Sequence, residues 1–399
     1  MPRLVSLAGL IVMLLLAWLL SADKRKMNWR LIISGIVLQF VLAIIILHTA
    51  PGQFIFDAVR ILITRLIGFS EAGSEFVFGT TFKEHFFAFS VLPTIIFVSS
   101  LMTVLFHLGI LQKVVEFMAR IMVYVMDTAG SESLATAANV FMGMAEAPLV
   151  IRPYIKTMTR SEIMALMTGG MATISGATLA AYTGFGADAG HLLTASIISA
   201  PAALVIAKIM IPETEISLTK GTVKAKIPKE DVNVLDAACR GAADGAKLAI
   251  NIAAVLICFI AFVAFANWLL SFLPNFNDKP FTLERILGYF LSPLAWIMGV
   301  QWKDASIVGA LLGKRTILNE FIAYLDLVKV KDVISYRSFT IATYALCGFA
   351  NLGSIAILIG GLGTLVPERR KDFATLGFKS MLAGMLACFM TATIAGVLI

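Results

Sequence analysis

The chain has 399 residues, of which 59% are hydrophobic and only 14% are charged, and its formal net charge is +7. A soluble protein would carry charge on about a quarter of its residues, so the composition excludes a soluble enzyme or binding module and indicates an integral membrane protein. The positive charge does not indicate nucleic-acid binding, because the basic residues fall in short loops between apolar runs, where they set the orientation of membrane helices.

Two apolar runs, 4–21 and 31–48, are predicted to cross the membrane. The basic cluster at 24–30 lies between them and is predicted to be cytoplasmic, which places the N-terminus outside. No small-residue cleavage site precedes a polar mature start, so the first run is interpreted as a retained helix and not as a signal peptide. Residues 51–85 have mixed polarity with helical spacing and predict a short interfacial helix.

The next elements are predicted to form the first half of a functional core. A third span is expected over 86–107, and an amphipathic cytoplasmic helix over 109–127. Residues 131–158 are too interrupted for a plain span, and the basic residues at both flanks predict a re-entrant hairpin that enters and leaves from the cytoplasm. Spans four and five are expected over 162–184 and 190–211.

The second half of the chain has the same order of elements. A cytoplasmic loop over 212–235 is indicated by four lysines, Lys220, Lys224, Lys226 and Lys229. Span six is expected over 246–273. Residues 274–300 predict an external interfacial helix, because they contain Pro274, Asp278, Pro280 and Pro293 and are bordered by two tryptophans suited to the headgroup level, Trp296 and Trp302. A second hairpin over 303–327 and spans seven and eight over 336–360 and 374–398 complete the chain.

The predicted fold class is therefore an all-α polytopic membrane protein. It has about eight transmembrane helices and two re-entrant helical hairpins that enter from opposite faces, in an inverted repeat with broken helices. The expected divisions are N-terminal scaffold helices over 1–107, the first half of the core over 108–211, a cytoplasmic loop over 212–245 and the second half of the core over 246–399.

A carboxylate lies in the middle of each predicted hairpin. Glu146 is placed between Gly143 and Pro148 in an apolar run, and a carboxylate that faced lipid there would cost about 3 kcal/mol or more. Glycine and proline are also what the tip of a broken element needs. Asn319 and Glu320 enter the second apolar segment in the same manner. We therefore expect both carboxylates to face inward, on a substrate path.

Each acidic segment is followed by an apolar helix that small and polar residues interrupt. The interruptions are at 172–176 and at 350–354. Paired interrupted segments in corresponding halves are the best sequence indication of a secondary transporter's binding site. The two halves share few identical residues, so this repeat indicates a common architecture only.

Over nearly the whole chain, the sequence resembles the concentrative nucleoside transporters. The resemblance is carried by the residues at 146–154, 158–162 and 167–176 in the first half, and by those at 319–324 and 349–351 in the second. It implies a homotrimer in the plasma or cell inner membrane, with each protomer importing nucleosides by an elevator movement coupled to an ion. No cofactor other than that ion is implied.

The resemblance also assigns roles by position. Glu146 would face the nucleobase, Glu320, Asn351 and Ser354 would bind the ribose hydroxyls, and Phe349 would form an aromatic wall. Sodium would be bound by the side chains of Asn139 and Thr173 and the carbonyls of Met142 and Ile174. A carboxylate and an amide suit vicinal hydroxyls, and a hard cation suits the oxygens freed at a helix break. The residues of the first hairpin that would lie on the nucleobase side of the substrate are Gly143, Met144, Ala145 and Glu146.

One departure from the family pattern concerns the nucleobase. The usual Gly-Gln-Thr/Ser-Glu is replaced by Gly143, Met144, Ala145 and Glu146, so an amide and a hydroxyl are lost. Met144 instead offers an adaptable apolar surface. The sequence therefore predicts that purine or modified nucleosides are favoured over the usual uridine type.

Other interpretations remain open at this level. Glu146 and Glu320 could be structural, each paired with Arg152, Lys314 or Arg315. Glu146 could carry a proton in place of sodium. The same hairpins could serve a non-nucleoside substrate, or, least favoured, the two carboxylates could act as acid and base in an intramembrane enzyme. The scattered cysteines and histidines have no metal-ligand spacing.

Overall fold

The computed structural model describes residues 2–221, 231–273 and 280–399. Within these ranges the chain is helical, and its only β pairing is an isolated bridge between Ala129 and Lys220. The predicted all-α fold class is confirmed. The predictions that concern Lys224, Lys226, Lys229, Pro274 and Asp278 fall outside the described residues.

Seven helical segments of the described chain are long and apolar enough to cross a membrane. They are Pro2–Leu19, Trp29–His48, Phe87–His107, Arg160–Phe185, Ala189–Met210, Val234–Leu270 and Pro367–Leu398. The predicted seventh span, 336–360, is divided between α15 (Tyr336–Leu346) and α16 (Leu352–Leu365), so neither piece reaches that length alone. The protein is therefore a multi-pass integral membrane protein.

The first 126 residues contain the peripheral helices and the helix that precedes the first hairpin. They are α1 (Pro2–Leu19), α2 (Trp29–His48), α3 (Ala50–Phe78), the turns η1 (Thr80–His85) and η2 (Phe87–Val91), α4 (Leu92–His107) and α5 (Ile110–Met126). The prediction of a short helix after residue 51 is corrected, because α3 has 29 residues. Thr49 caps its first turn, and nothing breaks the helix before Gly79, whose φ of +81° favours glycine.

The first half of the core contains the expected hairpin and broken helix. The hairpin consists of α6 (Gly130–Ala138), a non-helical tip over 139–146, η3 (Ala147–Ile151) and α7 (Arg152–Ile155). Span four is broken into α8 (Arg160–Ala172) and α9 (Gly176–Phe185), and α10 (Ala189–Met210) follows. The Ser175 hydroxyl caps α9 by accepting a hydrogen bond from the Thr178 N–H, so this side chain satisfies a donor that the break frees.

The second half repeats this order. Its elements are α11 (Val234–Leu270), α12 (Leu283–Ile297), α13 (Trp302–Ile317), α14 (Glu320–Lys329), α15, α16, η4 (Pro367–Arg369) and α17 (Arg370–Leu398). The second hairpin, α13 and α14, turns at Leu318 and Asn319. The break between α15 and α16 lies at 347–351, where Asn351 caps α16.

Helix α11 begins earlier than the sequence predicts. It starts at Val234, whereas span six was expected from residue 246, so the end of the predicted loop over 212–245 is helical. Asn233 caps the helix by accepting from the Asp236 N–H at 2.9 Å. Three charged residues of this early part of the helix, Asp236, Arg240 and Asp244, recur every four residues and therefore lie along one side of it.

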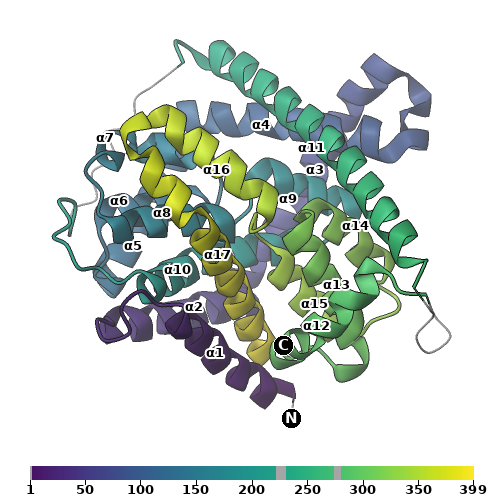
Figure 1. Ribbon diagram of the computed structural model, residues 1–399. Coiled ribbons are helices and arrows are strands. Elements are labelled where there is room, and N and C mark those ends of the chain that lie inside the picture. Colours follow the sequence, from purple (N-terminus) through teal and green to yellow (C-terminus); the bar gives the residue numbers. More distant parts are fainter. Residues whose placement is uncertain (1, 222–230, 274–279) are drawn as a thin grey trace.

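Helices α4 and α11 pack closely along one flank of the molecule (Figure 1). A Cβ at Gly241 would lie 2.7 Å from the Ser100 Cα, and one at Gly245 would lie 2.8 Å from the Ile96 Cα. The Ser100 hydroxyl also donates to the Ala238 carbonyl at 2.8 Å. Small residues four apart let two membrane helices approach in this way, so α4 and α11 form a tight pair.

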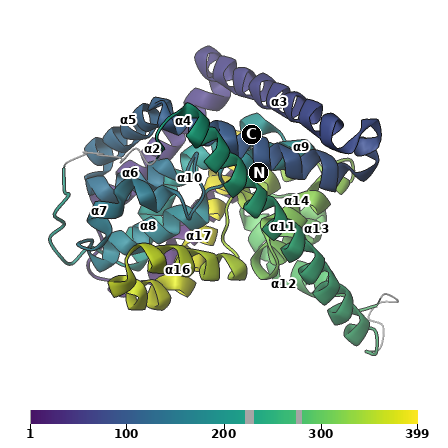
Figure 2. The same ribbon diagram turned by 90° about the horizontal axis from the view of Figure 1, so that it is seen from above.

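Helix α17 crosses the middle of the core and contacts α8, α10, α15 and α16 (Figure 1). Its C-terminal half is almost fully buried, and its end lies beside the N-terminus, where the Arg3 guanidinium donates to the Ile399 carbonyl at 3.1 Å. Helix α3 lies at one edge of the molecule, and α16 lies on the side opposite to α3 (Figure 2). The two broken helices thus meet around α17.

Candidate functional site

The tip of the first hairpin bends back on its own carboxylate. The Gly143 N–H donates to Glu146 Oε2 at 3.3 Å, and the Glu146 side chain is solvent-accessible. A hydrogen bond runs from the Gly176 N–H to the Phe141 carbonyl at 3.0 Å and joins this tip to the break in span four. The fold therefore places Glu146 beside the broken helix.

Glu146 lines a cavity between the hairpin tip and the α4–α11 pair. The polar lining residues are Ser99, Thr103, His107, Gln112, Glu146, Ser175, Asp231, Arg240 and Asp244. Arg240 and Asp231 form a two-pronged ion pair, with distances of 2.6 and 2.7 Å. Glu320 is not among the residues that line this cavity, so the two predicted carboxylates occupy separate parts of the site.

Met144 and Ala145 flank this cavity without facing it. Met144 is buried against α8, where a Cβ at Gly170 would lie 3.0 Å from the Met144 Cβ. Ala145 is exposed and lies against α16, since a Cβ at Gly361 would be 3.7 Å from the Ala145 Cβ. In this conformation, therefore, Glu146 is the residue of the altered motif that faces the cavity.

Asn139 and Thr173 belong to the hairpin tip and to the break in span four, and a Cβ at Gly170, three residues before Thr173, would lie 3.6 Å from the Asn139 Oδ1. The amide of Asn139 donates to the Ala135 carbonyl at 3.0 Å, but its Oδ1 atom is buried and has no hydrogen-bond partner. The Thr173 hydroxyl donates to the Gly169 carbonyl at 2.9 Å, which leaves its oxygen lone pairs available. An unsatisfied buried amide oxygen costs about 1–3 kcal/mol, and a hard cation would satisfy it. Met142 and Ile174 belong to the same two segments.

Glu320, Asn351 and Ser354 are brought together at the break in span seven. The Asn351 Nδ2 donates to Glu320 Oε2 at 2.8 Å, and its Oδ1 accepts from the Ser354 N–H at 2.9 Å. All three residues are buried, while Phe349 is half-buried beside them in the sequence. The arrangement fixes an amide and a carboxylate as neighbours. Two of about four lone-pair positions of Glu320 are used, so acceptors remain for hydroxyl groups.

Tyr182 completes this cluster and was not identified from the sequence. Its hydroxyl donates to Glu320 Oε1 at 3.1 Å, and its ring stacks on Tyr324 with 4.3 Å between the centroids. Tyr182 lies in α9, so it connects the first broken helix to the second hairpin. The one available signal was a tyrosine in a helix of mostly small and aliphatic residues.

The interpretation of the two carboxylates as structural ion pairs is wrong. Lys314 contacts Asp326 at 2.6 Å and Glu284 at 3.4 Å, and Arg315 donates to backbone carbonyls. Arg152 is exposed. Among the described residues, no ion pair includes Glu146 or Glu320. No cluster of metal-ligating histidine, cysteine or carboxylate side chains is found in the described ranges either.

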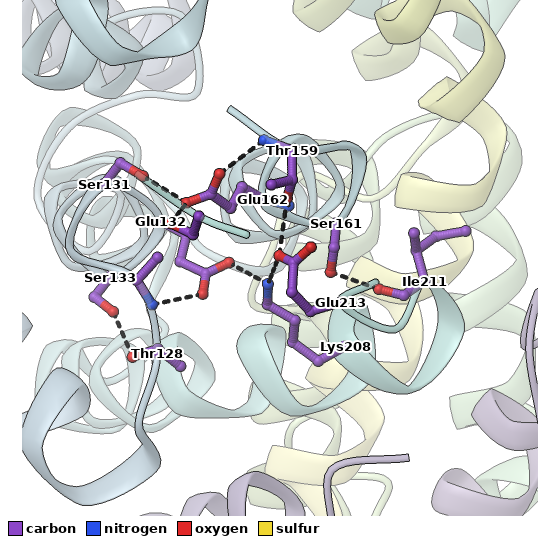
Figure 3. A network of polar contacts seen from close by, with 12 residues as sticks. Thr128, Ser131, Glu132, Ser133, Thr159, Ser161, Glu162, Lys208, Ile211 and Glu213 are labelled. Carbon is purple, nitrogen blue, oxygen red and sulfur yellow. Dashed lines mark hydrogen bonds and ion pairs between the residues drawn. The ribbon is translucent and has the colours of Figure 1, made fainter. Parts of the chain in front are cut away.

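A second buried network, at the base of the first hairpin, was also not identified from the sequence (Figure 3). Lys208 of α10 pairs with Glu132 of α6 at 2.7 Å and with Glu213 at 3.1 Å. Glu162 of α8 accepts hydrogen bonds from the Thr159 N–H and the Ser131 hydroxyl. The network fastens the first arm of the hairpin to α8 and α10, so it holds the tip in place.

Comparison with known protein families identifies this arrangement. Residues 8–81 match the family model "Na+ dependent nucleoside transporter N-terminus", residues 88–189 match "Nucleoside recognition", and residues 191–396 match "Na+ dependent nucleoside transporter C-terminus". The chain belongs to the sodium-dependent nucleoside transporter family. The resemblance found in the sequence is thereby confirmed.

Similar members of the sodium-dependent nucleoside transporter family are known from animals. Solute carrier family 28 member 3 of Eptatretus stoutii is 44% identical over 98% of this chain, and the human protein of that name is 42% identical over 99%. Sodium/nucleoside cotransporter 1 of Rattus norvegicus is also 42% identical over 99%. The chain spans 60%, 60% and 64% of the lengths of these three relatives.

Solved structures of the sodium-dependent nucleoside transporter family match the whole chain. CNTnw in an inward-facing substrate-bound state has a TM-score of 0.92 at 39% identity, and the comparison covers 100% of this chain and 98% of that one. A CNTnw variant in an intermediate state has a TM-score of 0.94 at 39% identity, with 100% and 99% covered. The order of hairpins and broken helices is therefore that of a nucleoside transporter.

Proposed function

We propose that this protein is a sodium-coupled symporter that imports nucleosides across the plasma (cell inner) membrane. The observation that carries the proposal is the buried Glu320–Asn351 pair, a carboxylate and an amide 2.8 Å apart at a helix break. Such a pair can accept from and donate to vicinal ribose hydroxyls at once. Membership of the sodium-dependent family supports the choice of substrate and ion.

The coupling ion of this proposal is sodium, bound between the hairpin tip and the break in span four. The unsatisfied buried Asn139 oxygen supports this choice, with the Thr173 hydroxyl and the carbonyls of Met142 and Ile174 as further ligands. Sodium is carried as cargo and would join α6 to α8 only while it is bound. Binding of sodium would therefore order the hairpin tip before the hairpins and broken helices move across the membrane.

The proposed transport cycle is an elevator movement in a homotrimer, as the family resemblance implies. The α4–α11 pair is the candidate for the stationary part, because its tight contact resists separation and α11 exposes a long row of apolar side chains. The hairpins, the broken helices and α17 would move together against this pair. The cavity beside Glu146 would then open toward the cytoplasm.

The test is uptake of radiolabelled uridine into proteoliposomes, with sodium and pH gradients imposed separately. We expect uptake that follows the sodium gradient, is inhibited by other nucleosides and is not inhibited by free bases. Uptake that follows the pH gradient and ignores sodium would replace sodium by a proton, with Glu146 as its carrier. If no nucleoside were taken up, the proposal would be wrong, and a non-nucleoside substrate would be favoured.

Base selectivity gives a separate prediction. The double change Met144→Gln and Ala145→Thr restores the polar pair that the family pattern usually has, so we expect uridine affinity to rise relative to adenosine by roughly tenfold. The measurement is competition of each nucleoside for uptake by the wild type and the variant. An unchanged ratio would show that Met144 and Ala145 do not set base selectivity.

A further inference from the structure

Arg315 is the largest fully buried side chain in the described chain. It lies in α13, near the turn of the second hairpin. A buried charge is costly unless it is paired or hydrogen-bonded, and Arg315 has no carboxylate oxygen within 4 Å among the described residues. Its location therefore requires another explanation.

The partners of Arg315 are the carbonyls at the broken end of α15. Its Nη1 donates to the Ala345 carbonyl at 2.9 Å and its Nε donates to the Gly348 carbonyl at 3.2 Å. The last carbonyls of a helix have no intrahelical donor, and the partial negative charge at a helix C-terminus favours a cation. Arg315 thus fixes the chain from the last turn of α15 to Gly348, which lies three residues before Asn351.

The second hairpin therefore holds the break in span seven at both ends. Arg315, just before the turn, holds the end of α15, and Glu320, just after the turn, holds the start of α16 through Asn351. The distance between the end of α15 and the start of α16 is therefore set by the short turn between α13 and α14. A displacement of Arg315 would move Asn351 relative to Glu320.

A thiol connects Arg315 to the other broken helix. Arg315 Nη2 donates to the Cys388 Sγ at 3.2 Å, and this sulfur lies 3.3 Å from the Cys347 carbonyl, just after α15, and 3.5 Å from the Ala172 carbonyl, where α8 ends. A Cβ at Gly348 would lie 2.8 Å from the Met171 carbonyl oxygen and 2.6 Å from the Cys388 Sγ. The ends of α8 and α15 are therefore in contact, with Thr173 directly after the first of them.

We propose that Arg315 is a positioning residue for the nucleoside site, which holds the broken end of α15 and, through the Cys388 thiol, links it to the end of α8 at the sodium site. The inference rests on the proposed sodium-coupled nucleoside transport. It explains how an ion bound at Asn139 and Thr173 alters the affinity for ribose at Glu320 and Asn351. The two sites are coupled because Arg315 holds the end of α15 and the thiol that it contacts lies against the end of α8.

The test compares Arg315→Lys with Arg337→Lys in proteoliposomes that hold equal amounts of protein. Arg337 is a matched control, since its guanidinium also donates to backbone carbonyls, those of Gly299 and Gly396, away from the break. Lysine keeps the charge but cannot reach both carbonyls and the thiol at once. We expect Arg315→Lys to raise the uridine KM at saturating sodium about tenfold or more, with a smaller change in the maximal rate. A KM equal to that of the wild type would overturn the proposal.

The link to the ion site is tested with Cys388→Ser and Cys388→Ala, which also decide the matter if Arg315→Lys does not fold. In the wild type, rising sodium should lower the uridine KM. Serine can still accept from Arg315 and donate to the Ala172 carbonyl, so this dependence should persist, whereas alanine should weaken it. An unchanged dependence in Cys388→Ala would overturn the link, and a wild type without sodium dependence would instead contradict the proposed function.

Discussion

Replacement of Glu320 by glutamine is expected to reduce the efficiency of nucleoside uptake at least about a hundredfold, because two hydrogen bonds from ribose hydroxyls to a charged acceptor would be lost or weakened. The carboxylate accepts from Tyr182 and Asn351 at 3.1 and 2.8 Å. A glutamine NH₂ would face one of these two donors, so the cluster would also rearrange. The measurement is the ratio of maximal rate to KM for uridine.

The control is Glu368→Gln, because Glu368 is an exposed carboxylate that pairs with Lys156 at 3.3 Å on the surface. This variant should transport as the wild type does. A nucleoside without ribose hydroxyls should compete with uridine for uptake by the wild type more weakly than a ribonucleoside does. The difference between the two competitors should be smaller in Glu320→Gln. Normal uridine uptake by Glu320→Gln would contradict the assignment of the ribose site.

The change Lys208→Met is expected to have the largest effect on stability. It removes the cation that lies 2.7 Å from Glu132 and 3.1 Å from Glu213, and so leaves buried carboxylate charge uncompensated. Removal of one partner from a buried ion pair costs about 3–5 kcal/mol. We expect a clearly lower midpoint of thermal denaturation of the protein in detergent, measured by loss of the monodisperse species.

The double variant Lys208→Met with Glu132→Gln tests the cause. Because it removes the uncompensated charge of Glu132 as well, it should recover part of the lost thermal stability. Lys329→Met is the control for loss of a lysine, since Lys329 is exposed and pairs with Asp326 on the surface. If Lys208→Met and Lys329→Met denatured at the same temperature, the network would not stabilise the hairpin.

Much of the architecture could be predicted because local chemistry determines it. The residues at 172–176 and 350–354 were expected to interrupt their helices with small and polar side chains, and the structure has a break at 173–175 and another at 347–351, which begins three residues before the predicted one. The start of α11 was missed because span six was expected only from residue 246, and residues 234–245 include Asp236, Arg240 and Asp244. A helix that extends beyond the bilayer carries charge at little cost, so composition does not mark its end.

The site residues that were missed are those whose role depends on distant partners. Tyr182 meets Glu320 across 138 positions, and Arg315 meets Cys388 across 73. No local pattern predicts such contacts, since each depends on how two broken helices pack. Asn139, by contrast, could be selected from the family pattern, and the structure adds that its oxygen is buried without a partner.

The cavity beside Glu146 has a consequence for pharmacology. One wall belongs to the hairpin tip and the other to α4 and α11, with Arg240 and Asp244 facing Glu146 across the opening. A compound with one cationic group for Glu146 and another for Asp244 would bind both walls at once. In an elevator movement the two walls must move relative to each other. A compound bound to both would block this displacement and arrest transport, although it would resemble no nucleoside.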